Sequence, residues 1–262
     1  MKNYYYRLSN CLLLYPLIKL CRFFYKNLSN IDLKFTRSEH KLLELRNNYV
    51  RKRCFIIGNG PSLKKTNLSL LKNEYTFGLN RIYLLFKDIG FETSFYVSVN
   101  KLVLKQFEKD INKLNIPKFI SSSGLKYINE DKNTIFLRSL PEITFSKNPI
   151  RGVWHDSTVT YTAMQIAYWM GFSEVFLVGI DHSFATKGKA DKTIISKGPD
   201  KNHFIDNYFG KGVKWQLPNL EGSELAYRMA KAQFERDGKK IVNATIGGKL
   251  EIFPRVKLES LF

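Results

Sequence analysis

Short apolar runs alternate with segments of helical spacing along most of the chain after residue 53. The runs are rich in β-branched and aromatic residues, and the segments between them place apolar residues three and four positions apart. This alternation is typical of an α/β fold in which crossover helices join the strands of a mostly parallel sheet. The expected strands are 54–57, 75–79, 95–99, 118–120, 134–137, 174–179 and 240–243.

The same pattern predicts helices over 101–114, 158–170 and 223–236. The second of these follows Asp156 and Ser157, which are residue types that cap helix amino termini, and it ends before a glycine. A different kind of segment follows the strand that ends at residue 179. It is rich in Lys, Asp, Asn and Gly and has no sustained periodicity, so we expect a lid-like segment over about 182–221, with disorder as the competing interpretation.

Composition narrows the class of protein. Of the 262 residues, 44% are hydrophobic and 14% are aromatic, which excludes a disordered, collagenous or coiled-coil chain. Lys and Arg number 42 against 23 Asp and Glu, a formal net charge of +19 that favours polyanions, anionic lipids or phosphorylated ligands as partners. Residues 1–54 hold 12 Lys and Arg against 3 Asp and Glu, so they carry +9, about half of the excess.

Residues 1–50 are expected to form a basic, aromatic and amphipathic helical segment, followed by one sheet domain over 51–262. The longest apolar run near the start, 11–18, is too short to span a bilayer. Lys19 and Arg22 interrupt the pattern that a signal peptide needs. The mixture is typical of an anchor on an anionic membrane surface, and a helix packed on the protein itself or on a second subunit fits equally well.

The number and spacing of the cysteines indicate the cellular compartment. Cys11, Cys21 and Cys54 match neither a disulfide framework nor a zinc site, which favours a reducing environment. Together with the basic amino-terminal segment, this predicts a cytoplasmic protein that is peripheral on the inner face of the membrane.

The sharpest local motif is Gly58-Asn59-Gly60-Pro61-Ser62, directly after the first expected strand. A tight glycine turn lets backbone N–H groups approach a ligand at the carboxyl end of a strand, where open α/β sheets bind nucleotides. The motif is neither a dinucleotide fingerprint nor a Walker A loop. A plain tight turn is an equally good interpretation.

Polar residues follow other strands at the same edge of the expected sheet. Asn80 and Asn100 end the second and third strands, so we expect them to converge with Asn59 on one crevice, where amides suit ribose hydroxyls and base edges. Ser157 and Thr158 begin a helix whose dipole favours a phosphate. The alternative is that these asparagines only form turns and that the hydroxyl residues are ordinary caps.

Histidine is the natural general base near neutral pH, and two histidines lie where catalytic residues are expected. His182 follows Asp181 at the end of the most apolar strand, and His203 lies in the lid-like segment near Tyr208. No D-x-D, C-x-x-C or H-E-x-x-H motif occurs, so no metal site is predicted. No nucleic-acid-binding signature is present either, which disfavours that partner.

Together these motifs resemble the bacterial sialyltransferases of glycosyltransferase family 42. The resemblance lies in residues 56–63, in Asn80 and Asn100, in the pair 157–158 and in the Val-Gly-Ile-Asp run 178–181. They are still more similar to a related group, domain-of-unknown-function 115, which includes hydroxymethylpterin pyrophosphokinase-like proteins and motility accessory factors. Further motifs at 202–204, 208–210, 220–224 and 243–251 carry that similarity, and the motifs cover about residues 53–257.

The resemblance implies a Rossmann-like sheet that binds a cytidine nucleotide and transfers an acidic sugar from its CMP-activated form without a metal or other cofactor. Carried over by motif, the nucleotide-binding residues are Gly58, Asn59, Gly60, Ser62, Asn80, Asn100, Ser157, Thr158 and Asp181. The base is His203, or failing it His182, and Tyr208 is the candidate to brace the leaving phosphate.

We therefore expect a membrane-associated glycosyltransferase that uses a nucleotide-sugar donor and a glycan or glycolipid acceptor in bacterial capsule or lipopolysaccharide biosynthesis. Two alternatives stay open. One is an ATP-dependent pterin pyrophosphokinase-like enzyme, which would need magnesium and acidic ligands. The other is a non-catalytic basic adaptor that binds anionic lipid or nucleic acid. A homo-oligomer is also open.

Overall fold

The computed structural model describes residues 36–262, so residues 1–35 of the amino-terminal helical segment expected over 1–50 lie outside the described residues. The chain divides into two units, Met1–Thr36 and Arg37–Phe262. The second unit thus starts before residue 51, where the sequence placed the domain boundary. Its first helix, α3 (Arg37–Glu44), belongs to the sheet unit because Leu42 is 1% exposed in the core and its carbonyl accepts the Trp169 indole N–H at 2.7 Å.

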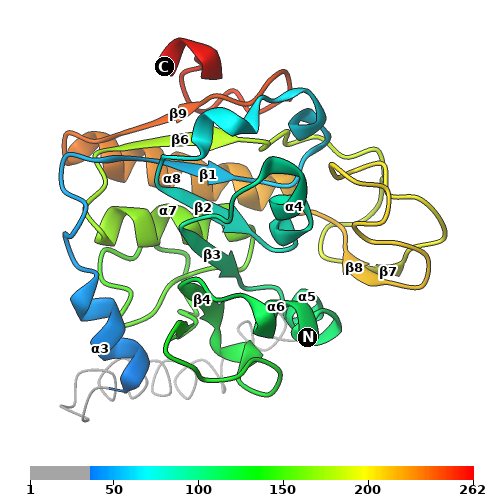
Figure 1. The fold of residues 1–262 in the computed structure, drawn as a ribbon, viewed down its shortest axis with the longest axis horizontal. Coiled ribbons are helices and arrows are strands. Elements are labelled where there is room, and N and C mark those ends of the chain that lie inside the picture. The colour runs from blue at the N-terminus through cyan, green and yellow to red at the C-terminus, as the bar shows by residue number, and fades with distance from the viewer. Residues whose placement is uncertain (1–35) are drawn as a thin grey trace, which may run out of the picture. The chain divides into compact units, whose positions relative to one another are not determined.

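A parallel sheet of seven strands forms the centre of this unit (Figure 1). The strand order is β5-β4-β3-β2-β1-β6-β9, and every neighbouring pair is parallel. The strands are β1 (Arg53–Ile57), β2 (Thr76–Leu79), β3 (Phe95–Ser98), β4 (Lys118–Ser121), β5 (Thr134–Leu137), β6 (Glu174–Val178) and β9 (Lys240–Asn243). The predicted α/β class, the parallel sheet and the predicted strands are confirmed.

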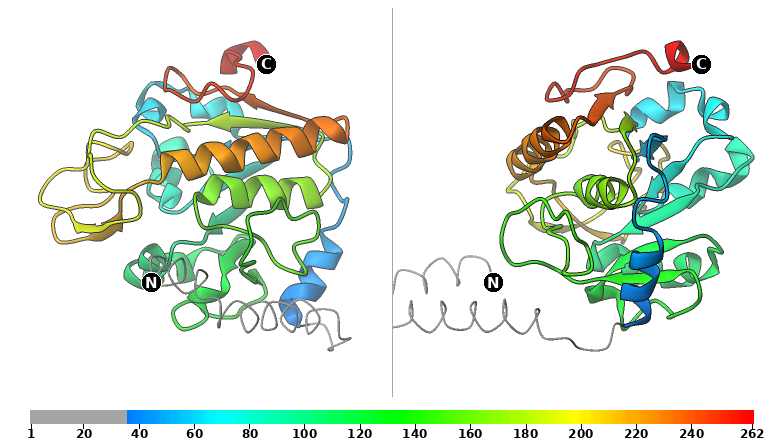
Figure 2. Two further views of the ribbon diagram at one scale, coloured as in Figure 1. Left: turned by 180° about the vertical axis from the view of Figure 1, so that it is seen from behind. Right: turned by 90° about the vertical axis from the view of Figure 1, so that its left-hand side faces the viewer.

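The strands are covered on both faces, which explains their continuous apolar runs. Along β1, Cys54 and Ile56 pack into one hydrophobic core, and Phe55 and Ile57 pack into the other. Helices α7 (Val159–Trp169) and α8 (Leu220–Arg236) pack together and cover the first face, as Figure 2 shows. The opposite core receives residues from the helical turns that follow β1, β2 and β3.

The strand order reverses between β1 and β6. From β1 the chain adds β2, β3, β4 and β5 outward in one direction, and it then returns to place β6 on the other side of β1. Open α/β sheets bind ligands outside the carboxyl ends of the strands at such a switch point. The glycine motif follows β1 and Asp181 follows β6, so both lie at this point.

Short helical elements complete the unit. The structure has α4 (Phe86–Ile89), η1 (Pro61–Lys65), η2 (Leu68–Leu71), η3 (Ile82–Leu85), η4 (Ser122–Gly124) and η5 (Leu258–Leu261), the last five being 3₁₀-helices. No helix within residues 36–262 combines the length and the apolarity needed to cross a membrane.

Two helix predictions need correction. The helix expected over 101–114 is two helices, α5 (Lys101–Gln106) and α6 (Glu108–Lys113), with a break at Phe107. Phe107 leaves the helical conformation where its ring packs 3.7 Å from the Arg81 guanidinium. Helix α8 begins before the expected residue 223 because Asn219 caps it by accepting a hydrogen bond from Gly222 N at 2.8 Å.

The lid-like segment, residues 182–221, contains structure that the sequence did not predict. Strands β7 (Thr193–Ile195) and β8 (Lys214–Gln216) pair in antiparallel register and project beyond the carboxyl ends of the main strands (Figure 1). They are three residues each, too short for an alternating pattern to be recognised. Unlike the exposed strand β7, the turns over 200–210 have more buried residues than exposed ones.

Candidate active site

The loops after β1 and β6 lie against each other at the switch point. Gly58 N donates to Val178 O at 2.8 Å, and Gly60 N donates to Gly179 O at 2.9 Å. A Cβ atom on Gly58 would overlap the Gly179 carbonyl, and one on Gly60 would overlap the Asp181 carboxylate. Glycine is therefore required at both positions by the close approach of the two loops.

Ser62 and Asp181 hold this loop in place. Asp181 accepts hydrogen bonds from the Ser62 backbone N–H at 3.1 Å and from its hydroxyl at 2.6 Å. Burial raises the pKa of Asp181, and the two bonds from Ser62 oppose that rise. The sequence placed both residues at a nucleotide, but in the structure they contact each other and neither lines the cavity described next.

A cavity of about 140 Å³ lies between the carboxyl ends of β1, β2 and β3 and the lid-like segment. Asn59, Asn80 and Asn100 all line it, so the predicted convergence of the three amides is present. Leu102 and Val103 of α5 also line it, and the lid-like segment contributes the remaining residues: Phe184, His203, Tyr208, Phe209, Lys214, Trp215, Gln216 and Pro218.

The first two amides retain hydrogen-bonding capacity for a ligand. Asn59 Nδ2 donates to Leu79 O at 3.0 Å, while Asn59 Oδ1 is buried and has no hydrogen-bond partner within the described residues. A buried acceptor of this kind is costly unless something donates to it. Asn80, with a positive φ of 48°, accepts at Oδ1 from the Ser98 hydroxyl at 3.1 Å.

Asn100 differs from Asn59 and Asn80 because both its amide oxygen and its amide nitrogen are engaged in hydrogen bonds within the protein. Its Oδ1 caps helix α5 by accepting from Leu102 N at 2.9 Å and from Val103 N at 3.3 Å. Its Nδ2 donates to Gln216 Oε1 in β8 at 3.1 Å. The side chain therefore joins the end of β3 to the lid-like segment at the cavity.

His203 is held by a buried carboxylate. Its Nδ1 lies 2.7 Å from Asp200 Oδ2, and its ring stacks on Tyr208 with centroids 4.0 Å apart and planes 8° apart. Burial by itself raises the pKa of Asp200, but the bonds from His203 and from backbone N–H groups outweigh it, so this pKa lies below its ordinary value. An ionised Asp200 and an imidazole at the cavity wall form an arrangement suited to general base chemistry.

Tyr208 fixes this part of the segment to the sheet. Its hydroxyl accepts from Arg81 N at 3.2 Å, and the Arg81 guanidinium donates to the carbonyl oxygens of Asn207 at 3.2 Å and of Tyr208 itself. Burial raises the pKa of the Tyr208 phenol. The ring of Tyr208 lines the cavity, while its hydroxyl is engaged at the end of β2.

The remaining sequence-predicted residues lie at a second position on the same edge. His182 Nε2 is 3.2 Å from Glu224 Oε1 in α8. Thr158 caps α7, and the carbonyl of Ser157 accepts from the Ser223 hydroxyl at 3.3 Å. The structure thus brings His182, Ser157 and Thr158 to the start of α8, and none of them is among the residues that line the cavity.

Several lining or supporting residues were not predicted. The role of Asp200 could have been predicted, because it precedes His203 by three residues and this spacing lets the two side chains meet within one turn. Trp215 and Lys214 had none, since the position of β8 depends on contacts with α5: Gln106 bonds both the N–H and the carbonyl of Lys214, at 2.9 and 2.7 Å.

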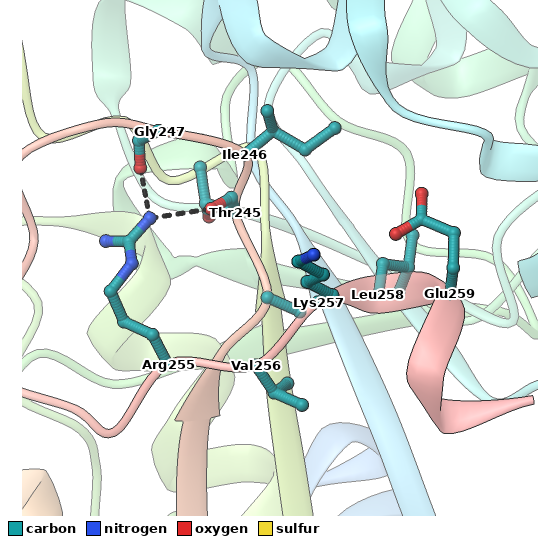
Figure 3. A pocket seen from close by; sticks show the side chains of 9 residues that line it. Thr245, Ile246, Gly247, Arg255, Val256, Lys257, Leu258 and Glu259 are labelled. Atoms are coloured by element: carbon teal, nitrogen blue, oxygen red, sulfur yellow. Dashed lines mark hydrogen bonds between the residues drawn. The ribbon is translucent and has the colours of Figure 1, made fainter.

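A second cavity of about 360 Å³ lies beyond the carboxyl end of β9 and is lined by residues 244–247 and 255–259 (Figure 3). Arg255 donates to the carbonyl oxygens of Thr245, at 2.8 Å, and of Gly247. These bonds close the loop after β9 and engage the charge of Arg255. No histidine lines this cavity, so the smaller cavity is the better candidate for the site.

Among residues 36–262, no three His, Cys, Asp or Glu side chains gather in a group that could hold a metal ion.

Comparison with known proteins connects this geometry to a family and a fold. The family model for 6-hydroxymethylpterin diphosphokinase MptE-like proteins matches residues 24–187. The structure of the MAf glycosyltransferase from Magnetospirillum magneticum AMB-1 is similar, with a TM-score of 0.54 and 14% sequence identity. The match covers 86% of this chain and 38% of that one, so this chain spans well under half of the MAf glycosyltransferase. No curated protein matches the chain.

Proposed function

The chain belongs to the 6-hydroxymethylpterin diphosphokinase MptE-like family and has a glycosyltransferase-like fold, and from that premise we propose that it is a metal-independent glycosyltransferase acting on a CMP-activated acidic sugar. One observation carries the proposal. The amides at the ends of β1, β2 and β3 line the same cavity as His203, so groups suited to a nucleoside lie beside a general base.

The cavity offers both surfaces that a cytidine needs. The rings of Phe209 and Trp215 stack on each other, with centroids 5.6 Å apart, and both residues line the cavity. The unpartnered Asn59 Oδ1 would accept a hydrogen bond from an amino or hydroxyl group of the ligand. Lys214 supplies a positive charge at the cavity wall for the phosphate.

The proposed reaction is a single displacement. The oxygen of an acceptor hydroxyl attacks the anomeric carbon of the donor, and its proton passes to Nε2 of His203. The bond between the anomeric carbon and the phosphate oxygen breaks, and its electron pair leaves with CMP. The Lys214 ammonium would stabilise the charge that develops on the departing phosphate.

The size of the cavity adds a requirement. Its volume of about 140 Å³ is below the roughly 300–1,000 Å³ of ligand sites, so a nucleotide sugar would enter only after the outer part of the lid-like segment moves. That part includes β7 and β8, which carry Lys214 and Trp215.

Two histidine variants test the proposal. We expect His203→Ala to keep the affinity for CMP within about threefold and to lower CMP release from CMP-N-acetylneuraminic acid, in the presence of a lipopolysaccharide extract, by about 10²–10⁴-fold, as loss of a general base does. His182→Ala is the matched control and should change release by no more than a few-fold, because His182 does not line the cavity. Equal turnover of wild type and His203→Ala would remove His203 from the role.

The description of the family favours a second candidate, a pterin pyrophosphokinase that uses ATP. Thermal shifts recorded separately with CMP, CDP, UDP and ATP plus magnesium distinguish the two. Stabilisation by CMP supports the glycosyltransferase. Stabilisation by ATP with magnesium alone would overturn the CMP proposal in favour of the pyrophosphokinase.

We place the reaction in capsule or lipopolysaccharide biosynthesis at the cytoplasmic face of the membrane. The net charge of +9 in residues 1–54 supports this location, because anionic lipid headgroups attract clustered Lys and Arg.

A further inference from the structure

The carboxylate of Asp200 is buried and held by hydrogen bonds at both oxygens. Its side chain is 3% exposed, and both of its oxygens accept hydrogen bonds. Oδ1 accepts from Asn202 N at 2.7 Å, and Oδ2 accepts from Phe209 N at 3.1 Å in addition to its bond with His203. Asn202 N and Phe209 N can only donate, and one of them bonds each oxygen, so the surroundings favour the carboxylate form that accepts at both oxygens.

The ionised state of Asp200 determines where His203 holds its proton. A carboxylate accepts hydrogen bonds and donates none, so the proton between the two side chains resides on Nδ1 of the imidazole. In the neutral ring Nε2 is then left with a lone pair. Since Nδ1 faces the buried carboxylate and His203 lines the cavity, Nε2 is the nitrogen that can meet a substrate.

The ring of His203 is also prevented from turning. It lies flat on Tyr208, and the rings of Phe209 and Trp215 approach it edge-on with centroids at 5.1 and 6.3 Å. The adjacent Phe204 N donates to Asn59 O at 3.0 Å, which ties the loop of His203 to the glycine motif. The imidazole is therefore fixed relative to the first of the three amides.

We propose that Asp200 is a positioning residue that selects the Nδ1–H tautomer of His203 and so makes Nε2 the base of the displacement. The tautomer of His203 does not depend on the proposed function, whereas the use of Nε2 as the base rests on it. When Nε2 takes the proton from the acceptor hydroxyl, the imidazolium that forms stays paired with the carboxylate, which lowers the cost of the transfer.

The tautomer can be measured without any substrate. Long-range ¹H–¹⁵N correlation spectra of the full chain labelled at histidine separate the protonated and unprotonated ring nitrogens at a pH of about 8, where an ordinary imidazole is neutral. The His203 signals are identified by their absence from the His203→Gln spectrum. We expect a protonated Nδ1 in wild type, and a proton on Nε2 there would overturn the proposal.

Two carboxamide variants complete the test. Asp200→Asn keeps the shape but has only one acceptor oxygen, so it cannot accept at both former oxygen positions, and we expect the His203 signals to move toward the Nε2–H form. Asp206→Asn is the control, because the side chain of this aspartate, in the same loop, is 74% exposed and pairs with Lys64 at 3.5 Å. An unchanged tautomer in Asp200→Asn would overturn the proposal even if the variant folds as wild type does.

Activity separates this inference from the function on which it rests. We expect Asp200→Asn to lower CMP release about 10²-fold or more while CMP affinity stays within threefold, and Asp206→Asn to leave both unchanged. If the tautomer changes as expected but wild type transfers no sugar from a CMP donor, the glycosyltransferase proposal fails and the role of Asp200 stands. If transfer occurs and Asp200→Asn retains it, the role of Asp200 fails alone.

Discussion

The imidazole of His203 lies flat on the phenol ring of Tyr208, with centroids 4.0 Å apart and ring planes within 8°. The hydroxyl of the same phenol accepts a hydrogen bond from Arg81 N at 3.2 Å, directly after the end of β2. Tyr208 therefore connects the candidate base to the sheet edge that carries Asn80. His203, in the lid-like segment, is thus held in position through the contact of Tyr208 with the end of β2.

This connection predicts the effect of removing one hydroxyl. Tyr208→Phe keeps the ring stack but leaves the buried N–H of Arg81 without its acceptor, so we expect a loss of about 1–3 kcal/mol in the free energy of unfolding. Tyr75→Phe, at an exposed tyrosine, should change it by less than about 0.5 kcal/mol. Urea titrations of both variants check this, and equal stabilities would show that the Tyr208 hydroxyl bonds nothing of consequence.

The glycine motif gives a steric prediction. Gly60 has an ordinary φ of −70°, so Gly60→Ala introduces no backbone strain, but its Cβ would collide with the Asp181 carboxylate that bonds Ser62. We expect a loss of about 2–3 kcal/mol in stability and a weaker affinity for CMP, because the loop that carries Asn59 must shift.

Gly198→Ala is the matched control for that substitution. A Cβ at Gly198 meets no atom within 4 Å, and its φ is not in the left-handed region. Its stability should stay within about 0.5 kcal/mol of wild type. A Gly60→Ala protein as stable as this control would show that the two loops separate at little cost.

The contact between α5 and β8 predicts a change in local opening. Gln106 bonds the backbone of Lys214 twice, as a neighbouring strand would, so Gln106→Ala removes two hydrogen bonds at the exposed edge of β8. We expect amide hydrogen exchange in β7 and β8 to accelerate about tenfold, since each bond contributes about 0.5–1.5 kcal/mol. Lys105→Ala, at the exposed preceding residue, should leave exchange unchanged. Identical exchange in both variants would mean that other contacts hold these strands.

A buried lysine predicts a dependence of stability on pH. Lys118 is 0% exposed, and its ammonium donates to Asp131 Oδ2 at 2.9 Å and to Leu114 O at 2.8 Å. Burial by itself raises the pKa of Asp131, but Lys118, Thr134 and a backbone N–H outweigh it, so this pKa lies below its ordinary value. The carboxylate therefore stabilises the fold above the unfolded-state pKa of about 3.9, and this contribution is lost as pH falls through the folded-state pKa.

Asp131→Asn removes that contribution. Because Asp131 is 39% exposed, solvent screening reduces the usual cost of breaking a buried pair, and we expect a loss of about 1–2 kcal/mol at neutral pH. In urea titrations the difference from wild type should become smaller as the pH falls below the unfolded-state pKa of about 3.9. Asp88→Asn, at an exposed position, is the control. A difference that stays constant between neutral and acid pH would contradict the assignment.

The amino-terminal residues predict membrane binding. Residues 1–36 hold 6 Lys and Arg against 1 Asp, and each such cation near an anionic surface contributes about 1 kcal/mol. We expect the full chain to float with vesicles that contain phosphatidylglycerol and not with phosphatidylcholine vesicles, and a chain that starts at Arg37 to float with neither. Equal flotation of both chains would place the membrane contact in the sheet unit.

Much of the fold was predictable from local sequence. Strands β1 and β6 are buried on both faces, so every residue after the charged first one, Arg53 or Glu174, is apolar and the run itself marks the strand. Helix α7 is flanked by its capping residue Thr158 and, after Met170, by Gly171. The break at Phe107 was not predictable, because the local spacing over 101–114 stays helical and the contact of the Phe107 ring with Arg81 joins positions remote in the sequence.

The candidate site divides in the same way. The convergence of Asn59, Asn80 and Asn100 on one cavity followed from local sequence, because residues after neighbouring parallel strands share an edge of the sheet. The places of the two histidines and of Asp181 depend instead on contacts between distant parts of the chain: His203 lines the cavity, His182 pairs with Glu224, and Asp181 bonds Ser62. The turns over 200–210 have no periodicity of their own, and they are placed by distant contacts such as the one between Arg81 and Tyr208.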